Sequence, residues 1–254
     1  MNLLKKEFHD NEAIIWYLGH SGWAVKTRSR MMIFDYVEWM KSPAELSLSG
    51  GFVNPDEIED EKVVVFVSHR HGDHFSRVVL EWKKSVKDIH YVFGWKEEDG
   101  GQSIYAQPGL NKVVDGLNIR TITSTDDGVG FLIHVDGLVL FHAGDHAHWG
   151  DPVELYTGEI DSLAEHCESV DIAFLPVSTS MGERLESITE GVLYAVRMLK
   201  PKVIFPMHCG NKEHLSEAFA NDMEGQISDV VICCAMQKGA TYLYNDGRVS
   251  ELIE

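Results

Sequence analysis

The chain has 254 residues, of which 44% are hydrophobic and 24% charged, a composition typical of a globular protein with one large core or two modest ones. Its 22 basic and 40 acidic side chains give a formal net charge of -18, and such a field repels phosphate backbones and anionic membrane surfaces. We therefore expect neither nucleic acid nor a membrane as a partner.

The N-terminal residues, MNLLKKEFHDNEAIIWYLG, contain neither a long apolar segment nor a small-residue cleavage site, so we expect no signal peptide. No run reaches the roughly 18 apolar residues of a membrane-spanning helix. The four cysteines form no CxxC pair and are expected to be buried, reduced thiols: Cys167, Cys209, Cys233 and Cys234. These features predict a cytoplasmic protein, and they leave homo-oligomer formation open.

Apolar runs predict four strands in the first part of the chain, at 13–19, 23–27, 31–36 and 63–67. The last run, VVVFV, is continuously apolar, which is typical of a strand buried on both faces. Residues 37–61 are mixed in polarity and predict a long irregular connection. Residues 75–86 carry apolar side chains at helical spacing.

The second part of the chain alternates predicted strands and helices. Four strand-like runs cover 112–142, and Asp136–Gly137 between two of them is a strong hairpin signal. Helices are expected at 158–168, at 186–200, and in the stretch that follows residue 208 and ends near residue 224. Strands are expected at 171–177, 202–208, 230–236 and 241–247. Two strand-rich halves with helices, and no linker between them, predict a single α/β domain over 1–254, layered as a four-layer αββα sandwich.

The stretch SHRHGDHF at 68–75 follows the buried VVVFV strand and holds four metal-ligand side chains within six positions: His69, His71, Asp73 and His74. Neutral imidazoles and a carboxylate suit zinc, and they also tolerate iron or manganese. His69 and His71 are two residues apart, so they face the same side of an extended segment. The turn at Gly72 lets the other two side chains project differently, and the loop can serve two neighbouring metal positions.

Two further stretches carry the same chemistry at strand ends, where loops converge on a rigid scaffold. LVLFHAGDHAHW places Asp145 in a tight turn, and VIFPMHCG places His208 at the end of another strand. With Asp35 of IFDY, the ordered motifs HRHGDH, HAGDH and PMH resemble the metallo-β-lactamase superfamily over about residues 13–245. The opening WYLGHSGWAV followed by IFDY looks like the branch with ascorbate-phosphate lactonases and N-acyl-phosphatidylethanolamine phospholipase D.

The resemblance implies a fold and a ligand set. The fold is the metallo-β-lactamase fold, and the first metal is bound by His69 and His71. The resemblance assigns Asp73, His74 and His208 to the second metal, with Asp145 bridging both metals. Asp35 is implied to lie behind the ligand loop and to orient an imidazole or the turn; the alternative is a strand-end aspartate that caps the following loop.

This sequence departs from the family pattern at one ligand. The family supplies a further histidine to the first metal, but the corresponding stretch, RTITSTDDGVGFLI, contains none. Asp126 is the candidate substitute ligand, and the alternative is that STDDG is a turn capped by its own side chains. The sequence therefore leaves the number of bound ions at one or two. Zinc is the expected metal, and manganese and iron are the alternatives. His20, His146 and His148 are candidate pocket residues.

The expected activity is that of a metal-dependent hydrolase, in which metal-bound hydroxide attacks a small ester, lactone or phosphodiester. Asp73 is expected to orient the hydroxide and accept its proton. Trp39, Met40, Phe52 and the loop 177–187 are expected to border the cleft for a small-molecule substrate. Two alternatives on the same fold stay open: a mononuclear iron dioxygenase, and a non-catalytic metal-binding scaffold.

Overall fold

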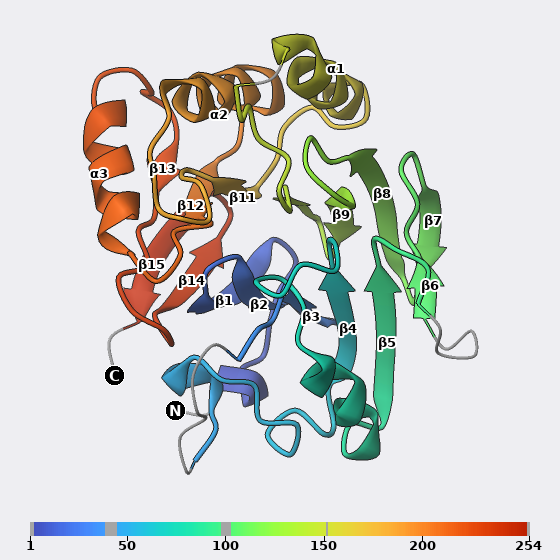
Figure 1. The fold of residues 1–254 in the computed structure, drawn as a ribbon. Helices are drawn as coiled ribbons and strands as arrows, with labels where there is room; N and C mark the ends of the chain where they lie inside the picture. Colours follow the sequence, from blue (N-terminus) through green and yellow to red (C-terminus); the bar gives the residue numbers. More distant parts are fainter. Residues whose placement is uncertain (1–2, 39–44, 98–102, 151, 253–254) are drawn as a thin grey trace. The chain divides into compact units, whose positions relative to one another are not determined.

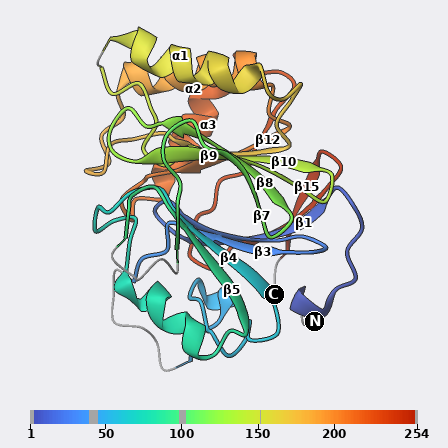
Figure 2. The same ribbon diagram turned by 90° about the vertical axis from the view of Figure 1, so that its right-hand side faces the viewer.

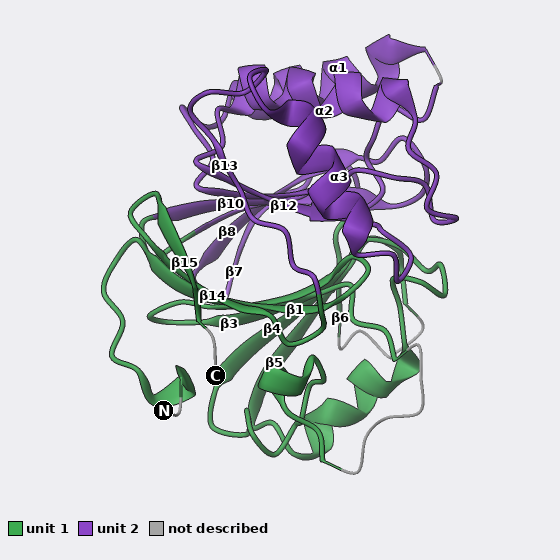
Figure 3. Cartoon of the chain, turned by 90° about the vertical axis from the view of Figure 1, so that its left-hand side faces the viewer, with its two compact units in different colours: residues 1–106, 135–137, 237–254 green, residues 107–134, 138–236 purple. Residues whose placement is uncertain are grey.

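The computed structural model describes residues 3–38, 45–97, 103–150 and 152–252. Trp39 and Met40, two of the expected cleft residues, lie outside these ranges. The chain divides into two compact units (Figure 3). The first unit comprises residues 1–106, 135–137 and 237–254, and the second comprises 107–134 and 138–236. Each unit contains one β-sheet, and the prediction of a single domain stays a prediction.

The first unit is built on an eight-stranded sheet in the order β15-β14-β1-β2-β3-β4-β5-β6 (Figure 1). Neighbours from β15 to β3 are antiparallel, and those from β3 to β6 are parallel. The strands are β1 (Glu12–Gly19), β2 (Gly22–Lys26), β3 (Met31–Phe34), β4 (Lys62–Val67), β5 (Asp88–Phe93), β6 (Ser103–Tyr105), β14 (Thr241–Asn245) and β15 (Arg248–Leu252).

Three short 3-10 helices accompany this sheet: η1 (Leu3–Lys5), η2 (Leu48–Gly50) and η3 (Arg77–Lys84). Val79 and Trp82 of η3 join a buried cluster with alternate side chains of the central strands, including Val63 and Val65 of β4. Because alternate strand residues point to the same face, this cluster covers one face of the sheet. The helical spacing predicted for 75–86 is confirmed, although the helix formed is of the 3-10 type.

The second unit is built on a seven-stranded sheet in the order β13-β12-β11-β10-β9-β8-β7. Its helices lie on one face of this sheet, with α1 against α2 (Figure 2). The strands are β7 (Asn111–Val114), β8 (Leu117–Thr123), β9 (Val129–Val135), β10 (Leu138–His142), β11 (Ile172–Pro176), β12 (Val203–Met207) and β13 (Val231–Ile232), and the helices are α1 (Val153–Ala164), α2 (Glu186–Leu199) and α3 (His214–Met223).

The parallel strands of the second unit set where its site residues lie. β10, β11, β12 and β13 are parallel neighbours, so their carboxyl ends meet at one edge of the sheet. Asp145 follows β10 and His208 follows β12. Helix α2 ends as expected before Pro201, with Lys200 in the left-handed region (φ 47°), because a following proline disfavours the right-handed helical conformation.

One strand prediction needs correction. The run 230–236 pairs only over Val231–Ile232, because β13 has partners only at Val203 and Ile204 of β12. Of the four cysteines expected to be buried, Cys209 and Cys233 are buried, whereas Cys167 and Cys234 are only partly buried. The predictions at 13–19, 23–27, 63–67, 171–177 and 202–208 are confirmed within one or two residues at each end.

Within the described part of the chain, no helix has both the length and the apolar character needed to cross a bilayer.

The predicted hairpin between β9 and β10 is confirmed, with Asp136 at φ 47° and Gly137 at φ 84°. The Asp136 carboxylate, which belongs to the first unit, accepts hydrogen bonds from the Thr27 hydroxyl and the Ser29 N–H, both at 2.7 Å. Burial raises the pKa of this carboxyl, but these hydrogen bonds outweigh burial and the net pKa lies below its ordinary value. Ionised Asp136 therefore stabilises the fold.

We predict that Asp136→Asn lowers the free energy of unfolding by about 1 kcal/mol at pH 7, because a charged acceptor becomes a neutral one. A carboxyl with a lowered folded-state pKa stabilises above its unfolded-state pKa, and this contribution disappears as pH falls through the folded-state pKa. Chemical denaturation should show the difference between wild type and variant shrinking below about pH 4. Asp246→Asn, at the exposed turn between β14 and β15, is the control. A difference that is independent of pH contradicts the prediction.

Candidate metal centre

The first unit presents four of the predicted ligands on the loop Ser68–Phe75, directly after β4. The loop turns tightly, because the N–H of His74 donates to the carbonyl of His71 at 3.0 Å. His69 and His74 are buried, His71 is exposed and Asp73 is half-buried. The Nε2 atom of His69 lies 3.0 Å from Nδ1 of His71. This is a hydrogen-bond distance, and the two rings meet edge to face with centroids 4.5 Å apart, so the short loop holds the two imidazoles together.

Asp35 supports this loop from the end of β3. β3 and β4 are parallel and in register up to Phe34 and Phe66, so Asp35 lies beside the start of the loop. Its carboxylate is 1% exposed and accepts three hydrogen bonds: from Ser68 N–H at 2.7 Å, from Ser68 Oγ at 2.7 Å and from His74 Nδ1 at 2.8 Å. The backbone is held in the left-handed region, at φ 41°. Asp35 therefore orients both the loop backbone and one imidazole.

These contacts determine which ring nitrogen of each histidine carries a proton. The Asp35 carboxylate only accepts, so Nδ1 of His74 is the protonated nitrogen and Nε2 carries the lone pair of the neutral ring. Ser68 Oγ donates to Asp35, so it accepts from Nδ1 of His69 at 2.9 Å. His69 Nε2 then also carries a lone pair. Metal-binding histidines have this arrangement, with one nitrogen held by the protein and the other directed at the ion.

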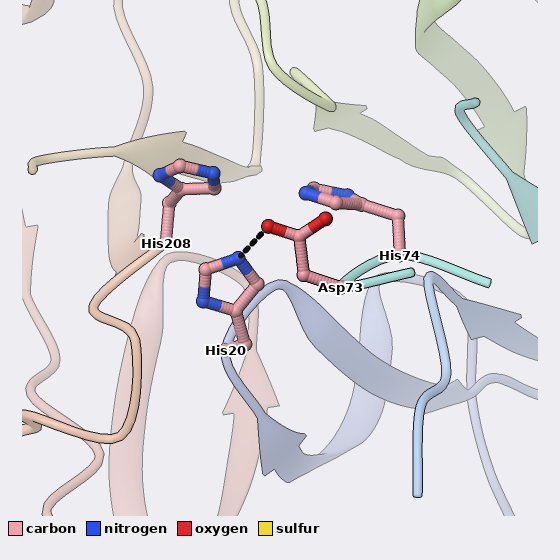
Figure 4. Close-up of side chains that lie close together, drawn as sticks. All are labelled: His20, Asp73, His74 and His208. Carbon is pink, nitrogen blue, oxygen red and sulfur yellow. Dashed lines mark ion pairs between the residues drawn. The ribbon is translucent and has the colours of Figure 1, made fainter. Parts of the chain in front are cut away.

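His20 joins the first unit's set from the turn between β1 and β2. Its imidazole is 1% exposed, and Nε2 lies 3.6 Å from Oδ2 of Asp73. One ligand atom each from His20, Asp73 and His74 lies within 4.8 Å of the others, and Figure 4 shows the Asp73 carboxylate between the two rings. The neighbouring His20 holds the pKa of Asp73 well below its usual range, against the opposing effect of burial. Asp73 is thus an ionised acceptor at neutral pH.

The second unit contributes His208 and Asp145. His208 follows β12 at φ 66° and is 2% exposed. Its Nδ1 donates to the carbonyl of Ser178 at 2.8 Å, and the Ser178 hydroxyl donates back to the carbonyl of His208 at 2.9 Å. Nε2 of His208 lies 3.3 Å from Oδ1 of Asp145. The indole N–H of Trp149 donates to the Asp145 carbonyl at 3.0 Å, which braces the turn that carries the carboxylate.

The contact between His208 and Asp145 has the chemistry of a cation site. A carbonyl only accepts, so Nδ1 of His208 carries a proton, and Nε2 is the nitrogen that faces Asp145. A lone pair and a carboxylate oxygen repel at 3.3 Å unless a proton or a metal ion neutralises them. An imidazole and a carboxylate are also the donors that zinc prefers after thiolate. The residues present therefore fit a metal ion.

Asp126, the candidate substitute ligand, is held near Asp145 by the preceding residue. The Thr125 hydroxyl donates to the carbonyl of Ala147 at 2.6 Å and accepts from its N–H at 2.9 Å. Asp126 and Asp145 offer carboxylate oxygens within 4.8 Å of each other. The alternative reading is also visible, since the N–H of Asp126 donates to Ser124 Oγ at 3.2 Å in a self-capped turn. Capping uses the backbone and leaves the carboxylate available as a ligand.

The remaining candidate pocket residues lie in different surroundings. His146 is 1% exposed and stacks on Tyr156 with ring centroids 4.7 Å apart. Burial lowers the pKa of His146 to about 4, so its ring is neutral at pH 7. Among the described residues, neither His146 nor His148 belongs to a set of three or more clustered ligand groups. Phe52 is half-buried in the first unit, with Lys238 Nζ 5.1 Å from its ring centroid.

Sequence reasoning did not assign roles to Ser68 and Ser178, which orient two of the predicted ligands. Ser68 directly precedes His69 and links it to Asp35. Ser178 lies in the loop 177–187, which was expected only to border a cleft, and it binds His208 through its backbone carbonyl. The sequence could have indicated the role of Ser68, because this serine lies at the end of the VVVFV strand and directly precedes a predicted ligand. Nothing in the sequence pairs Ser178 with a residue 30 positions later.

Comparison with known proteins gives concordant matches. A family model described as "Beta-lactamase superfamily domain" matches residues 14–208. Among curated proteins, a UPF0173 metal-dependent hydrolase of Pelotomaculum thermopropionicum is 29% identical over 213 residues, which cover 76% of this chain and 83% of the relative.

Among solved structures, Igni18, a novel metallo hydrolase from the hyperthermophilic archaeon Ignicoccus hospitalis, matches with a TM-score of 0.65 at 21% identity and covers 92% of this chain and 99% of its own. CmlA, a diiron β-hydroxylase from Streptomyces venezuelae, matches with a TM-score of 0.60 at 11% identity, over 96% of this chain and 54% of CmlA. At these identities the two structures bear on the fold alone. With the family model, they confirm the predicted α/β class and the metallo-β-lactamase fold.

We predict that Asp35→Asn lowers metal affinity 10- to 100-fold, because the amide cannot replace a carboxylate that accepts from both Ser68 and His74. Competition with a chromophoric chelator measures this affinity. Asp60→Asn removes an exposed carboxylate of the same unit and is the control, with unchanged affinity expected. An Asp35→Asn protein that folds and binds metal as wild type does would show that Asp35 supports only the loop.

Proposed function

Because the chain belongs to the β-lactamase superfamily, we propose that it is a metal-dependent hydrolase that acts on a small ester, lactone or phosphodiester. The observation that carries this proposal is the 3.3 Å approach of His208 Nε2 to Asp145 Oδ1, which places a buried imidazole nitrogen beside a buried carboxylate, the donor pair of a metal site. The description of the curated relative as a metal-dependent hydrolase supports the same reading. The cytoplasmic location and the small-molecule substrate stay predictions.

We propose the ligand set implied by the family pattern. His69 and His71 bind the first metal, with Asp126 in place of the family's further histidine. Asp73, His74 and His208 would hold the second metal, and Asp145 would be shared by both. The protein-held Nδ1 atoms of His69, His74 and His208 support this assignment, because each leaves Nε2 for a ligand bond.

The expected ions are one or two zinc ions, because neutral imidazoles and carboxylates suit this metal, with manganese or iron as alternatives. A bound ion supplies Lewis acidity, which lowers the pKa of a coordinated water and polarises the substrate oxygen. Asp73 is the proposed catalytic residue. In this proposal its carboxylate accepts a hydrogen bond from the attacking water, orients that water and takes its proton. Asp35 acts through His74 and Ser68 as a positioning residue.

The first prediction from this proposal concerns activity. A panel of ester, lactone and phosphodiester substrates, assayed after chelation and after return of zinc or manganese, should show turnover only with metal. Asp73→Ala should lower this turnover at least 100-fold even when fully loaded, because orientation and proton transfer are both lost. Metal analysis of the purified protein accompanies the assay.

The matched control is Asp56→Ala, an exposed carboxylate of the same unit, which should keep wild-type turnover. Full activity of metal-loaded Asp73→Ala would remove Asp73 from the catalytic role. Bound iron with oxygen-dependent turnover would favour the dioxygenase, and no turnover with any metal would favour the non-catalytic scaffold.

The second prediction concerns Asp126. A carboxylate oxygen is a harder ligand than an imidazole, so Asp126→His should raise the affinity of the weaker metal position for zinc about tenfold and lower its relative preference for manganese. Titrations with both ions measure the change. The neighbouring exposed Asp127→His is the control, with no change expected. Equal behaviour of the two variants would show that Asp126 is only part of a capped turn.

A further inference from the structure

We propose that His20 is itself a metal ligand, so that His20, Asp73 and His74 form a three-ligand site within the first unit. This inference rests on the proposed function and extends it by a ligand that the family pattern does not assign. The three side chains come from the β1–β2 turn and from the loop after β4, and their ligand atoms lie within 4.8 Å of one another (Figure 4). Two imidazoles and a carboxylate are a donor set typical of zinc.

The distance between His20 and Asp73 matches two ligands of one ion. Nε2 and Oδ2 are 3.6 Å apart, which is longer than the roughly 2.7–3.2 Å of a hydrogen bond between nitrogen and oxygen. Two ligands held about 2.1 Å from a tetrahedral ion are about 3.4 Å apart. The two rings of His20 and His74 also meet edge to face, with centroids 5.3 Å apart, so both can present a nitrogen to the same point.

The backbone around His20 is specialised to hold the ring at this place. His20 has φ 53° and the preceding Gly19 has φ 106°, so the turn occupies the left-handed region that most side chains avoid. Such strain is commonly kept at functional sites. A Cβ on Gly22 would lie 3.1 Å from the carbonyl of Asp35, so glycine lets the turn pack on the end of β3. The same residue, Asp35, thus adjoins the His20 turn and orients His74.

Burial supports a ligand role over a surface role. The His20 side chain is 1% exposed, and an imidazole taken out of water needs polar partners to offset the loss of hydration. With His20 added, the position bound by Asp73 and His74 gains an imidazole. The other position has His69 and His71 and, in this chain, Asp126 in place of a histidine. We therefore expect two unequal affinities, with the tighter ion at His20.

The test measures metal binding in the full chain. His20→Asn keeps a residue that tolerates the left-handed backbone but withdraws the ring, and His20→Gly leaves space for free imidazole at no backbone cost. Zinc affinity is measured by chelator competition, and the visible spectrum of the cobalt-substituted protein reports the ligand set. We expect both variants to bind the tighter ion at least tenfold more weakly, with a changed cobalt spectrum, and added imidazole to restore both readouts in His20→Gly.

His134→Asn, a half-buried histidine of β9, is the control and should behave as wild type. Variants with wild-type affinity and wild-type cobalt spectrum would overturn the inference while leaving the proposed function intact. A wild-type protein that takes up no zinc or cobalt would overturn both. If the variants fail to fold, 15N-histidine coupling to 113Cd in the wild-type protein decides: coupling at His20 supports the inference, and its absence when other histidines couple refutes it.

Discussion

The buried carboxylate of Asp35 is the contact on which the candidate centre of the first unit depends. A charge with 1% exposure is costly unless hydrogen bonds replace its hydration, and here three donors do so. Two of them come from Ser68 and one from His74, so the observed conformation of the loop after β4 satisfies this charge. The hydrogen bonds that stabilise the Asp35 carboxylate also orient the His74 ring directly and the His69 ring through Ser68.

In the second unit, a backbone carbonyl rather than a carboxylate orients the imidazole. His208 is oriented by the Ser178 carbonyl, and Ser178 is in turn held by the carbonyl of His208. A neutral carbonyl raises the basicity of the opposite ring nitrogen less than a carboxylate does, so His208 is a weaker donor than His74. In the proposed ligand set, Asp126 stands in place of the family's further histidine at the first metal, whereas His208 belongs to the second. The proposed inequality of the two metal positions therefore rests on Asp126 and His20 rather than on His208.

Much of the fold was predictable because its strands are continuous apolar runs. VVVFV is such a run, and β4 occupies it. β5 (Asp88–Phe93) was not predicted, since Asp88 and His90 interrupt its apolar pattern, yet it forms because six residues pair in parallel with β4. β15 was missed for a similar reason: its polar residues are held by pairing with β14 at the edge of the sheet. Pairing partners, rather than local pattern, decide such strands.

The sequence by itself determined that HRHGDH, Asp145 and His208 each follow an apolar run, and from this it predicted them as ligands at the ends of strands. It also showed that the stretch around Asp126 lacks the histidine that the family pattern supplies. Only the tertiary structure decided which nitrogen each ring directs outward, that Ser68 and Ser178 hold those rings, and that His20 lies 3.6 Å from Asp73. The reason is physical: spacing along the chain sets the order of ligands, whereas ring orientation depends on partners that folding brings from distant segments.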